Sequence, residues 1–460
     1  MGILKKLTVL GAGLVVLFAV GFAVMWKIVT QPSALPLVGQ QWWGPGDAEQ
    51  IDPSIRPFKI PFSEQVSADL DHRLKHLPSI TPALEGSNFR YGFNAEYLRK
   101  VIDFWLFQYK WQERVNFLNS LPQFTTQISG LQLHFVHAKP VSIPDGTQVV
   151  PLLLLHGWPS SVREFYDLIP LLTTPHKNTN FVFEVIAPSL PGFGYSEGAA
   201  KPGLGAAQIA VVLKSLMERL KFKEFYVHGG DAGAIIGAIM GSLYPRSVRG
   251  FHSNMCYIST PWSTLKFFLG STWPSLFLDE LSDLRMPLKD YFAFMLEETG
   301  YTHIQASKPD TVGIALQSSP AGLAAYILEK FSTWTNPDWR SLPDGGLTKK
   351  FSLTDLLDNV MIYWITGSIT TSMRLYSETL NIAHMELQMD NVPVPVPTAC
   401  AVFPNELVYF SKSILMERFP NLVRFTNMPR GGHFPALEEP QLLAEDIWVA
   451  VLTMRNLTSN

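Results

Sequence analysis

Uninterrupted apolar runs that end in glycine constrain this fold most strongly. The segment VVPLLLLHG at 149–157 carries no charged residue, as expected for a parallel strand that is buried on both faces. Similar segments follow, with room for helices between them, at 181–189, 224–230, 249–254, 398–404 and 422–428, before a closing helix from about 438. This alternation of strands and helices predicts an α/β fold with a mostly parallel central sheet and helices on both faces.

The remaining segments are expected to surround this sheet. A strap rich in Pro and Gly and then helices occupy 28–128, the first part of the α/β core occupies 129–254, and its second part occupies 396–460. Residues 255–395 lack the strand–helix alternation and show mostly helical patterns. They predict a helical cap that is inserted over the carboxyl edge of the sheet.

The N-terminal segment 1–27 predicts a retained membrane anchor. Residues 7–26 carry no charge and follow Lys5 and Lys6. At about 1.5 Å per residue such a helix covers the hydrocarbon core of about 30 Å. A cleaved signal peptide would have a shorter apolar region and a small-residue cleavage site, which the next residues provide poorly. We therefore expect a single-pass N-terminal transmembrane helix.

Bulk composition narrows the set of partners. The net charge of −3 and the absence of long basic runs argue against nucleic acid. Cys256 and Cys400 are too few for a disulfide framework and have no metal-like spacing, so we assign them no function. We expect no metal, no cofactor and no obligate protein partner.

The stretch FYVHGGDAGAIIGA at 225–238 has the form of a nucleophile elbow, with Asp231 at the position of the nucleophile. Its glycines allow a strained backbone and close contact between a strand and a helix. An aspartate among glycines can also be a simple helix cap. The sequence GYSEG around Ser196 matches the same pattern, but it has Pro- and Gly-rich loops on both sides and therefore predicts a loop serine.

Two further segments complete a catalytic set. The strand ending at His156 runs into a loop whose Trp158 N–H, together with the Ala232 N–H, would form an oxyanion hole. Glu406 follows a strand, and His433 lies in a Gly-rich loop before the last helix, which completes the order nucleophile, acid, histidine. Surface-loop status is the alternative for His433, and Glu438 and Glu439 are less suitable alternatives for the acid.

An aspartate nucleophile restricts the chemistry. Its carboxylate is ionised at neutral pH and needs no base to attack. Attack on a saturated carbon gives a stable ester, which fits epoxides and alkyl halides. Dehalogenases commonly have Trp after the nucleophile, where this chain has Ala232. An opening epoxide needs a proton donor such as a phenol, and the residues alone do not choose among fourteen tyrosines.

Long motifs resemble the microsomal epoxide hydrolase family, which has the α/β-hydrolase fold, and most of all its insect juvenile hormone branch. They are HGWP, the Asp231 elbow, TGYTHIQASKPDTVGIAL (299–316), TTSMRLYSE (370–378), FPNEL and RGGHFPALEEP. The resemblance implies hydrolysis of lipophilic epoxides, with juvenile hormone or xenobiotic epoxides as substrates, at the membrane of the endoplasmic reticulum. It implies that Tyr301 and Tyr376 protonate the epoxide oxygen, and that His433, oriented by Glu406, activates water to hydrolyse the ester.

Two alternatives remain at this point. A haloalkane dehalogenase would share the aspartate nucleophile, although Ala232 argues against it. A catalytically silent relative that binds a lipophilic ligand is also possible, because family members usually have Trp at the position of Ala232.

Overall fold

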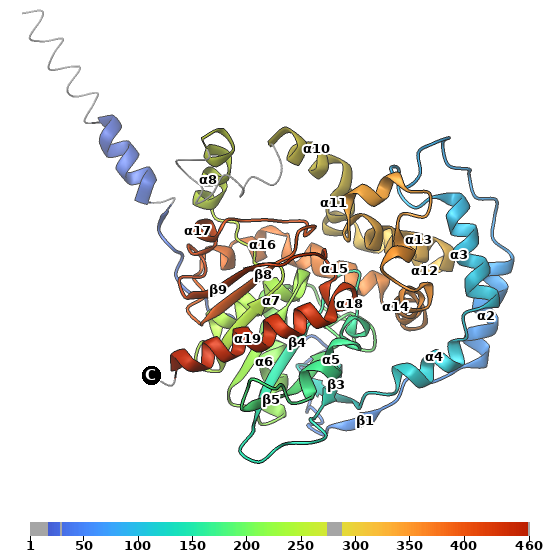
Figure 1. The fold of residues 1–460 in the computed structure, drawn as a ribbon, viewed down its shortest axis with the longest axis horizontal. Helices are drawn as coiled ribbons and strands as arrows, with labels where there is room; N and C mark the ends of the chain where they lie inside the picture. Colours follow the sequence, from blue (N-terminus) through green and yellow to red (C-terminus); the bar gives the residue numbers. More distant parts are fainter. Residues whose placement is uncertain (1–16, 28–29, 274–287, 459–460) are drawn as a thin grey trace, which may run out of the picture.

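The computed structural model describes residues 17–27, 30–273 and 288–458. Within these ranges one sheet contains nine strands in the order β1-β2-β3-β5-β4-β6-β7-β8-β9 (Figure 1). The strands are β1 (Arg56–Phe58), β2 (Gln123–Ile128), β3 (Leu131–Ala138), β4 (Gln148–Leu155), β5 (Phe181–Pro188), β6 (Phe225–Gly229), β7 (Val248–Ser253), β8 (Thr398–Val402) and β9 (Leu422–Asn427). Residues 1–16 of the expected membrane anchor lie outside the described residues.

Strand direction divides the sheet into two parts. β5, β4, β6, β7, β8 and β9 run parallel, which confirms the expected mostly parallel sheet. At one edge β1, β2 and β3 pair antiparallel, and β3 joins β5 antiparallel. The sequence patterns did not predict β1 and β2. The first is a three-residue edge strand that contains a proline, which an edge tolerates, and the second is the polar segment QFTTQI.

Successive side chains of the central strand β4 pack on opposite faces of the sheet. Leu153 and Leu155 belong to the cluster that includes α6 and α7, whereas Leu152 and Leu154 belong to the cluster that includes α5 and α19. The helices of the core are η1 (Val162–Phe165), α5 (Leu168–Thr173), α6 (Ala206–Arg219), α7 (Asp231–Leu243), α17 (Lys412–Leu415), α18 (Pro435–Glu438) and α19 (Pro440–Thr458).

Helix α7 approaches the sheet very closely. A Cβ at Gly233 would lie 2.1 Å from the Leu155 carbonyl oxygen, and one at Gly237 would lie 2.5 Å from the Phe251 ring. Glycine costs helix stability, but here no larger residue fits. The close approach places the first residue of α7, Asp231, directly above the carboxyl end of β4.

The cap consists of helices that follow β7 in the chain. It comprises α8 (Pro261–Thr272), α10 (Leu288–Glu298), α11 (Gly300–Ser307), α12 (Pro309–Ser318), α13 (Pro320–Thr333), η3 (Pro337–Ser341), η4 (Leu347–Lys349), α14 (Leu353–Thr366), α15 (Ile369–Thr379), α16 (Ile382–Met385) and η5 (Met389–Asn391). Its inner helices contribute to one pocket together with residues that follow β6, β7 and β8. The cap therefore covers the carboxyl ends of these strands.

Helices near the N-terminus brace the cap from outside (Figure 1). They are α2 (Glu64–Lys75), α3 (Ala95–Phe107) and α4 (Trp111–Leu118). The fully buried Asp358 of α14 accepts hydrogen bonds from Tyr109 Oη at 2.9 Å, Arg114 Nε at 2.9 Å and Arg163 Nε at 3.2 Å. One carboxylate thus connects the N-terminal helices, the core and the cap, and its removal would leave the buried Arg163 and the partly buried Arg114 without their shared partner.

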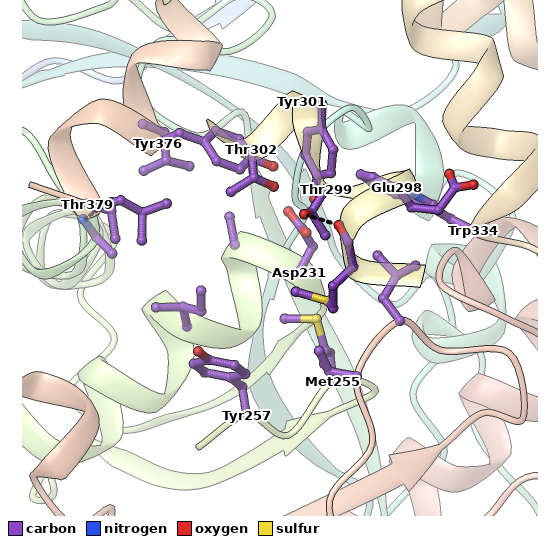
Figure 2. A pocket seen from close by; sticks show the side chains of 18 of the residues that line it. Asp231, Met255, Tyr257, Glu298, Thr299, Tyr301, Thr302, Trp334, Tyr376 and Thr379 are labelled. Atoms are coloured by element: carbon purple, nitrogen blue, oxygen red, sulfur yellow. Dashed lines mark hydrogen bonds between the residues drawn. The ribbon is translucent and has the colours of Figure 1, made fainter. Parts of the chain in front are cut away.

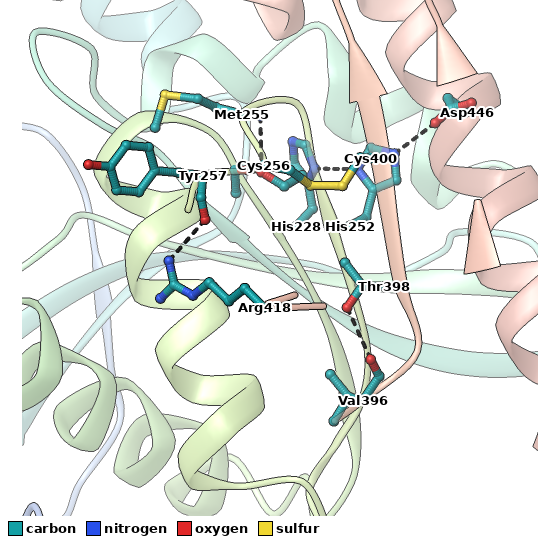
Figure 3. Close-up of a disulfide and its surroundings, with 12 residues drawn as sticks. His228, His252, Met255, Cys256, Tyr257, Val396, Thr398, Cys400, Arg418 and Asp446 are labelled. Atoms are coloured by element: carbon teal, nitrogen blue, oxygen red, sulfur yellow. Dashed lines mark hydrogen bonds and ion pairs between the residues drawn. A yellow bond between two sulfur atoms is a disulfide. The ribbon is translucent and has the colours of Figure 1, made fainter. Parts of the chain in front are cut away.

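A disulfide joins Cys256, which follows β7, to Cys400 in β8 (Figure 3). The sequence analysis assigned these cysteines no role. They are 144 residues apart in the chain, and their Cα atoms are 5.9 Å apart. The pairing depends on the insertion of the cap between two adjacent strands, and this adjacency is a property of sheet order that spacing along the chain does not show.

Among the described residues, no single helix is long and apolar enough to cross a membrane. The described part of the N-terminal segment, Leu17–Lys27, is a shorter apolar helix. The sharply bent pair α12 and α13 is together long and apolar enough to cross a membrane, but much of α13 is buried in the cap.

Candidate active site

Asp231 lies at the sharp turn between β6 and α7. Its backbone φ of 48° is in the left-handed region, which costs a residue with a side chain about 1–3 kcal/mol and persists only where the surroundings enforce it. Gly157 lies against the carboxylate, because a Cβ there would be 2.3 Å from Asp231 Oδ1. The backbone at Gly157 therefore restricts the position of the Asp231 side chain at the pocket.

The loop after β4 places a backbone donor on this carboxylate. The Trp158 N–H donates to Asp231 Oδ1 at 2.8 Å. The cap holds the loop in turn, since Asn359 Nδ2 donates to the Pro159 carbonyl at 2.8 Å. Ala232 is the next residue of α7, and in the described chain its N–H forms no hydrogen bond to the Asp231 carboxylate. Of the two expected oxyanion donors, the Trp158 N–H therefore already contacts the Asp231 carboxylate.

His433 lies between two carboxylates. Its Nδ1 donates to Glu406 Oε1 at 2.6 Å, and its Nε2 lies 3.4 Å from Asp231 Oδ2. The side chains of His433 and Glu406 are 1% and 3% exposed, so water screens neither of them. The Glu406 contact fixes which ring nitrogen faces Asp231.

The other two glutamates near this loop have different contacts. Glu438 accepts the backbone N–H groups of Gly432 and Phe434 at 2.7 and 2.8 Å, so it braces the loop on both sides of His433. Burial raises the pKa of Glu438 to about 8 despite these two hydrogen bonds. Glu439 forms ion pairs with Lys350 and Arg430, and neither glutamate forms a hydrogen bond to the His433 ring within the described chain.

The charge of His433 depends on its two neighbours. Burial alone would lower its pKa, but the carboxylates of Glu406 and Asp231 outweigh burial and raise the pKa to about 10. The imidazole is therefore protonated at neutral pH while Asp231 carries its charge. Once an ester neutralises Asp231, one of the two stabilising charges is lost and the imidazole becomes easier to deprotonate.

Two tyrosines of the cap contact the Trp158 ring and line the same pocket as the nucleophile Asp231. Tyr301 of α11 stacks on the Trp158 ring at 5.5 Å, and Tyr376 of α15 meets it edge-on at 6.0 Å. The two phenol rings are 5.9 Å apart. Burial raises the pKa of both hydroxyls, and the Asp231 carboxylate raises it further. Both groups are therefore protonated phenols that can donate to an oxygen at the pocket.

Asp231 and these tyrosines line a cavity of about 270 Å³, which we call the substrate pocket (Figure 2). Most of its lining is apolar or aromatic. The further lining residues include Ala206, Ala232, Ile235, Met255, Tyr257, Phe294, Met295, Trp334, Leu375, Leu380, Leu407 and Val408. The remaining lining residues, Glu298, Thr299, Thr302 and Thr379, are polar, so a few polar side chains lie in an otherwise apolar cleft, as is usual for a site that orients a lipophilic molecule.

The structure brings together the side chains of Asp231, Glu406, His433, Tyr301 and Tyr376, which were expected at the site. Ser196, which was expected to be a loop serine, and His156, at the end of the strand before the Trp158 loop, have structural contacts, and both are buried. Ser196 Oγ donates to the Ser189 carbonyl at 2.7 Å, and His156 Nε2 accepts the Leu190 N–H at 3.1 Å. Burial lowers the pKa of His156 to about 4. In the described ranges no group of three or more His, Cys, Asp or Glu residues is arranged to hold a metal ion.

Two family models match this chain. The model described as "Epoxide hydrolase N terminus" matches residues 55–165, and the "alpha/beta hydrolase fold" model matches residues 150–376. The first covers the end of the strap, the N-terminal helices and the first strands, and the second covers the elbow and most of the cap. One family model thus includes both the N-terminal helices and the start of the α/β core.

Similar proteins span nearly the whole chain. "Juvenile hormone epoxide hydrolase 1" of Ctenocephalides felis is 51% identical over 95% of this chain and 95% of its own length. "Epoxide hydrolase 1" of Sus scrofa is 46% identical over 93% of this chain and 95% of its own length. The crystal structure of juvenile hormone epoxide hydrolase from Bombyx mori superposes with a TM-score of 0.89 at 48% identity and covers 91% of this chain and 99% of that one.

Proposed function

Because this chain belongs to the epoxide hydrolase family and has the α/β-hydrolase fold, we propose that Asp231 opens lipophilic epoxides by attacking a ring carbon directly. The observation that carries this mechanism is the position of Asp231, which contacts Trp158 N–H and lies beside His433 while facing the phenols of the cap. No hydroxyl nucleophile occupies the elbow, so a saturated carbon suits the site better than a carbonyl.

The first step forms an ester. One oxygen of the Asp231 carboxylate attacks the carbon, the C–O bond of the epoxide breaks, and Tyr301 or Tyr376 supplies the proton for the departing oxygen. Two phenols beside one oxygen can share its developing charge. The Trp158 N–H meanwhile holds the other carboxylate oxygen, which becomes the carbonyl oxygen of the ester.

The second step hydrolyses the ester. His433, oriented by Glu406, takes a proton from water, and the water oxygen attacks the carbonyl carbon of the ester. The loss of the Asp231 charge on esterification lowers the pKa of His433 and makes it a base at the required moment. The rise in the pKa of His433 caused by Asp231 in the resting enzyme supports this timing.

Trapping the ester tests this mechanism. A His433→Gln variant, mixed with excess styrene oxide and quenched in acid, should gain the mass of one substrate molecule per chain, located on the peptide that contains Asp231. The matched double variant with Asp231→Ala should gain none. If the single variant shows no adduct while wild-type protein still forms diol, a direct attack by water replaces the covalent route.

We propose juvenile hormone as the physiological substrate. Three points support this choice: the apolar lining of the substrate pocket, its volume of about 270 Å³, and the similarity to juvenile hormone epoxide hydrolases of two insects. The test compares kcat/KM for juvenile hormone with kcat/KM for styrene oxide. A value at least ten times higher for the hormone is expected, and a higher value for styrene oxide would favour xenobiotic epoxides instead.

We also propose that the N-terminal segment anchors the enzyme in the membrane of the endoplasmic reticulum. The side chains of the apolar helix Leu17–Lys27 are exposed, and Trp26 packs on Trp262 of α8 at 4.6 Å. Large exposed apolar side chains continue onto α8 and α10, namely Leu265, Phe268, Trp273, Phe292 and Leu296. Phe294 and Met295 of the same α10 line the substrate pocket, so a lipid surface here would lie close to its entrance.

Membrane fractionation tests the anchor. The full chain should stay with microsomes after alkaline carbonate extraction, whereas a chain without residues 1–27 should be released. Full release of the intact chain would contradict the anchor. A Phe268→Ser and Phe292→Ser double variant should weaken the residual binding of the truncated chain to lipid vesicles, because exposed apolar area drives that binding.

A further inference from the structure

A second cavity borders Asp231 and shares no other lining residue with the substrate pocket. We call it the inner cavity. Its volume of about 10 Å³ is close to the room that a single water molecule needs. The lining residues are Gly157, Trp158, Ser160, Glu164, Phe165, His228, Gly230, Asp231, Asn254, His433, Phe434, Pro435 and Ala436. The inner cavity therefore joins the nucleophile and the histidine base in one small space.

Polar atoms in the inner cavity have hydrogen-bonding capacity to spare. Asn254 is 4% exposed, and its Nδ2 has no hydrogen-bond partner among the described residues. His433 Nε2 is likewise buried and without such a partner in the described chain. An unpaired buried donor is costly, and Glu164 adds a third buried polar group. Two to four such groups are what a bound water requires.

Local structure directs Asn254 to this position. It directly follows β7, and the preceding Ser253 Oγ donates to the Gly229 carbonyl at 2.8 Å and accepts the Met255 N–H at 3.0 Å. The Asn254 amide packs on Gly230, where a Cβ would be 2.6 Å from the Asn254 Oδ1. The next residue, Met255, lines the substrate pocket. Asn254 thus lines the inner cavity, and the residue after it lines the substrate pocket.

Glu164 of η1 is suited to a neutral role. Burial raises its pKa to about 8, with a contribution from the Asp231 carboxylate, although Ser160 and His433 lower it. At neutral pH the group is mostly a carboxylic acid, which can donate one hydrogen bond and accept others. It therefore adds no second negative charge beside the ester, and its carbonyl oxygen can still accept a hydrogen bond from a bound water.

We propose that the inner cavity holds the water that hydrolyses the ester, and that Asn254 and Glu164 are the residues that position it. The inference rests on the proposed function, since without an ester on Asp231 this water has nothing to attack. Asn254 Nδ2 donates to the water oxygen, while the two water protons face His433 Nε2 and the Glu164 carboxyl group. The oxygen is then directed at the ester from the side of the base.

Every atom is accounted for in this step. The water oxygen bonds to the Asp231 carbonyl carbon as one water proton passes to His433. The bond between that carbon and the ester oxygen, which came from Asp231 and is now bonded to the product, breaks, and the leaving alkoxide takes the proton from His433. The proton that His433 gave up on ester formation has already restored the phenol that protonated the epoxide. The new carboxyl group of Asp231 then passes its proton to His433, which restores the charged carboxylate and the protonated imidazole of the resting enzyme. The diol thus carries one oxygen from the epoxide and one from Asp231.

Separate rates of the two half-reactions test the proposal. Stopped-flow fluorescence of the pocket tryptophans with excess styrene oxide measures ester formation, and acid-quenched intact mass measures ester decay. Asn254→Ala should form the ester at the wild-type rate and hydrolyse it about 100-fold more slowly, because a misplaced nucleophile costs about that factor. The control Met255→Ala should alter ester formation and leave ester decay within about threefold of wild type.

Other outcomes decide against the proposal. Equal slowing of both steps in Asn254→Ala would show a general structural role, and an unchanged decay rate would place the water elsewhere. If even His433→Gln accumulates no ester, the covalent mechanism itself fails, and this result is distinct from an ester that forms and decays normally in Asn254→Ala.

Glu164 provides an independent pair of variants should Asn254→Ala not fold. Glu164→Gln keeps the size, the neutrality and one donor, so ester decay should stay within about threefold of wild type. Glu164→Ala should slow ester decay about 10-fold or more while ester formation, which also reports correct folding, is unchanged. Equal decay rates in the two variants would overturn the role of Glu164.

Discussion

The substrate pocket and the inner cavity meet at Asp231 and differ in size and chemistry. The substrate pocket has a volume of about 270 Å³ and a mostly apolar lining, whereas the inner cavity has about 10 Å³ and gathers Asn254, Glu164 and His433. A lipophilic epoxide fits the first, and one water molecule fits the second. One carboxylate can therefore serve two successive reactions, because the substrate and the water reach it from separate cavities.

The largest expected effect is on ester formation, the reaction that takes place in the substrate pocket. Replacement of both Tyr301 and Tyr376 by Phe should slow ester formation about 10⁴-fold, because no proton donor remains for the epoxide oxygen. Burst-phase kinetics with styrene oxide measure this step. The matched control is Tyr326→Phe, since the Tyr326 hydroxyl accepts a hydrogen bond from Gln305 and its ring also contacts Trp158. Wild-type ester formation in the double variant would remove both phenols from the mechanism.

Glu406, the carboxylate that orients His433, should affect hydrolysis of the ester and not its formation. Glu406→Gln removes one of the two charges that raise the pKa of His433 and weakens the contact that orients the ring. We expect ester decay to slow about 100-fold or more with little change in ester formation, as followed by acid-quench mass analysis. Slower ester formation with normal decay would reverse the roles assigned to the two sides of Asp231.

The smallest expected effect is on the free energy of unfolding, and it comes from Glu164 in the inner cavity. The folded pKa of Glu164, about 8, lies above its ordinary value of 4.5, so the native state binds more protons than the unfolded state between these pH values. The contribution of Glu164 to stability is therefore greatest below about pH 4.5 and falls as pH rises toward 8, by up to about 1.4 kcal/mol per pH unit.

Glu164→Gln removes this titration. Its free energy of unfolding in urea should therefore depend less on pH between 5 and 8 than that of the wild-type protein. Glu438→Gln is a matched comparison, because Glu438 is a buried glutamate whose pKa is also raised to about 8 but which lies outside the inner cavity. Identical pH dependence in wild type and Glu164→Gln would show that Glu164 is ionised in the folded protein.

Much of this architecture could be predicted because its signals are local. The apolar runs at β4, β5 and β6 and the glycines around Asp231 are visible in short windows, and chain order placed Glu406 and His433. The roles of Tyr301 and Tyr376 came from family resemblance, since nothing local distinguishes them from other tyrosines. Strand β2 was missed because its residues are polar and its burial depends on its neighbours.

The inner cavity and the disulfide could not be predicted for a different reason. Asn254 and Glu164 are isolated polar residues 90 positions apart in the chain, and they come together where β7 and the loop after β4 meet at one edge of the sheet. Cys256 and Cys400 likewise become neighbours through the adjacency of β7 and β8. Such pairs depend on strand order, which spacing along the chain does not contain.

In the proposed mechanism Asp231 donates an oxygen to the product and regains one from water. A single turnover in ¹⁸O-water, with enzyme in excess over styrene oxide, follows this oxygen exchange. We expect an unlabelled diol and one ¹⁸O atom in the peptide that contains Asp231. A diol that carries ¹⁸O after this first turnover, with an unlabelled Asp231 peptide, would contradict it.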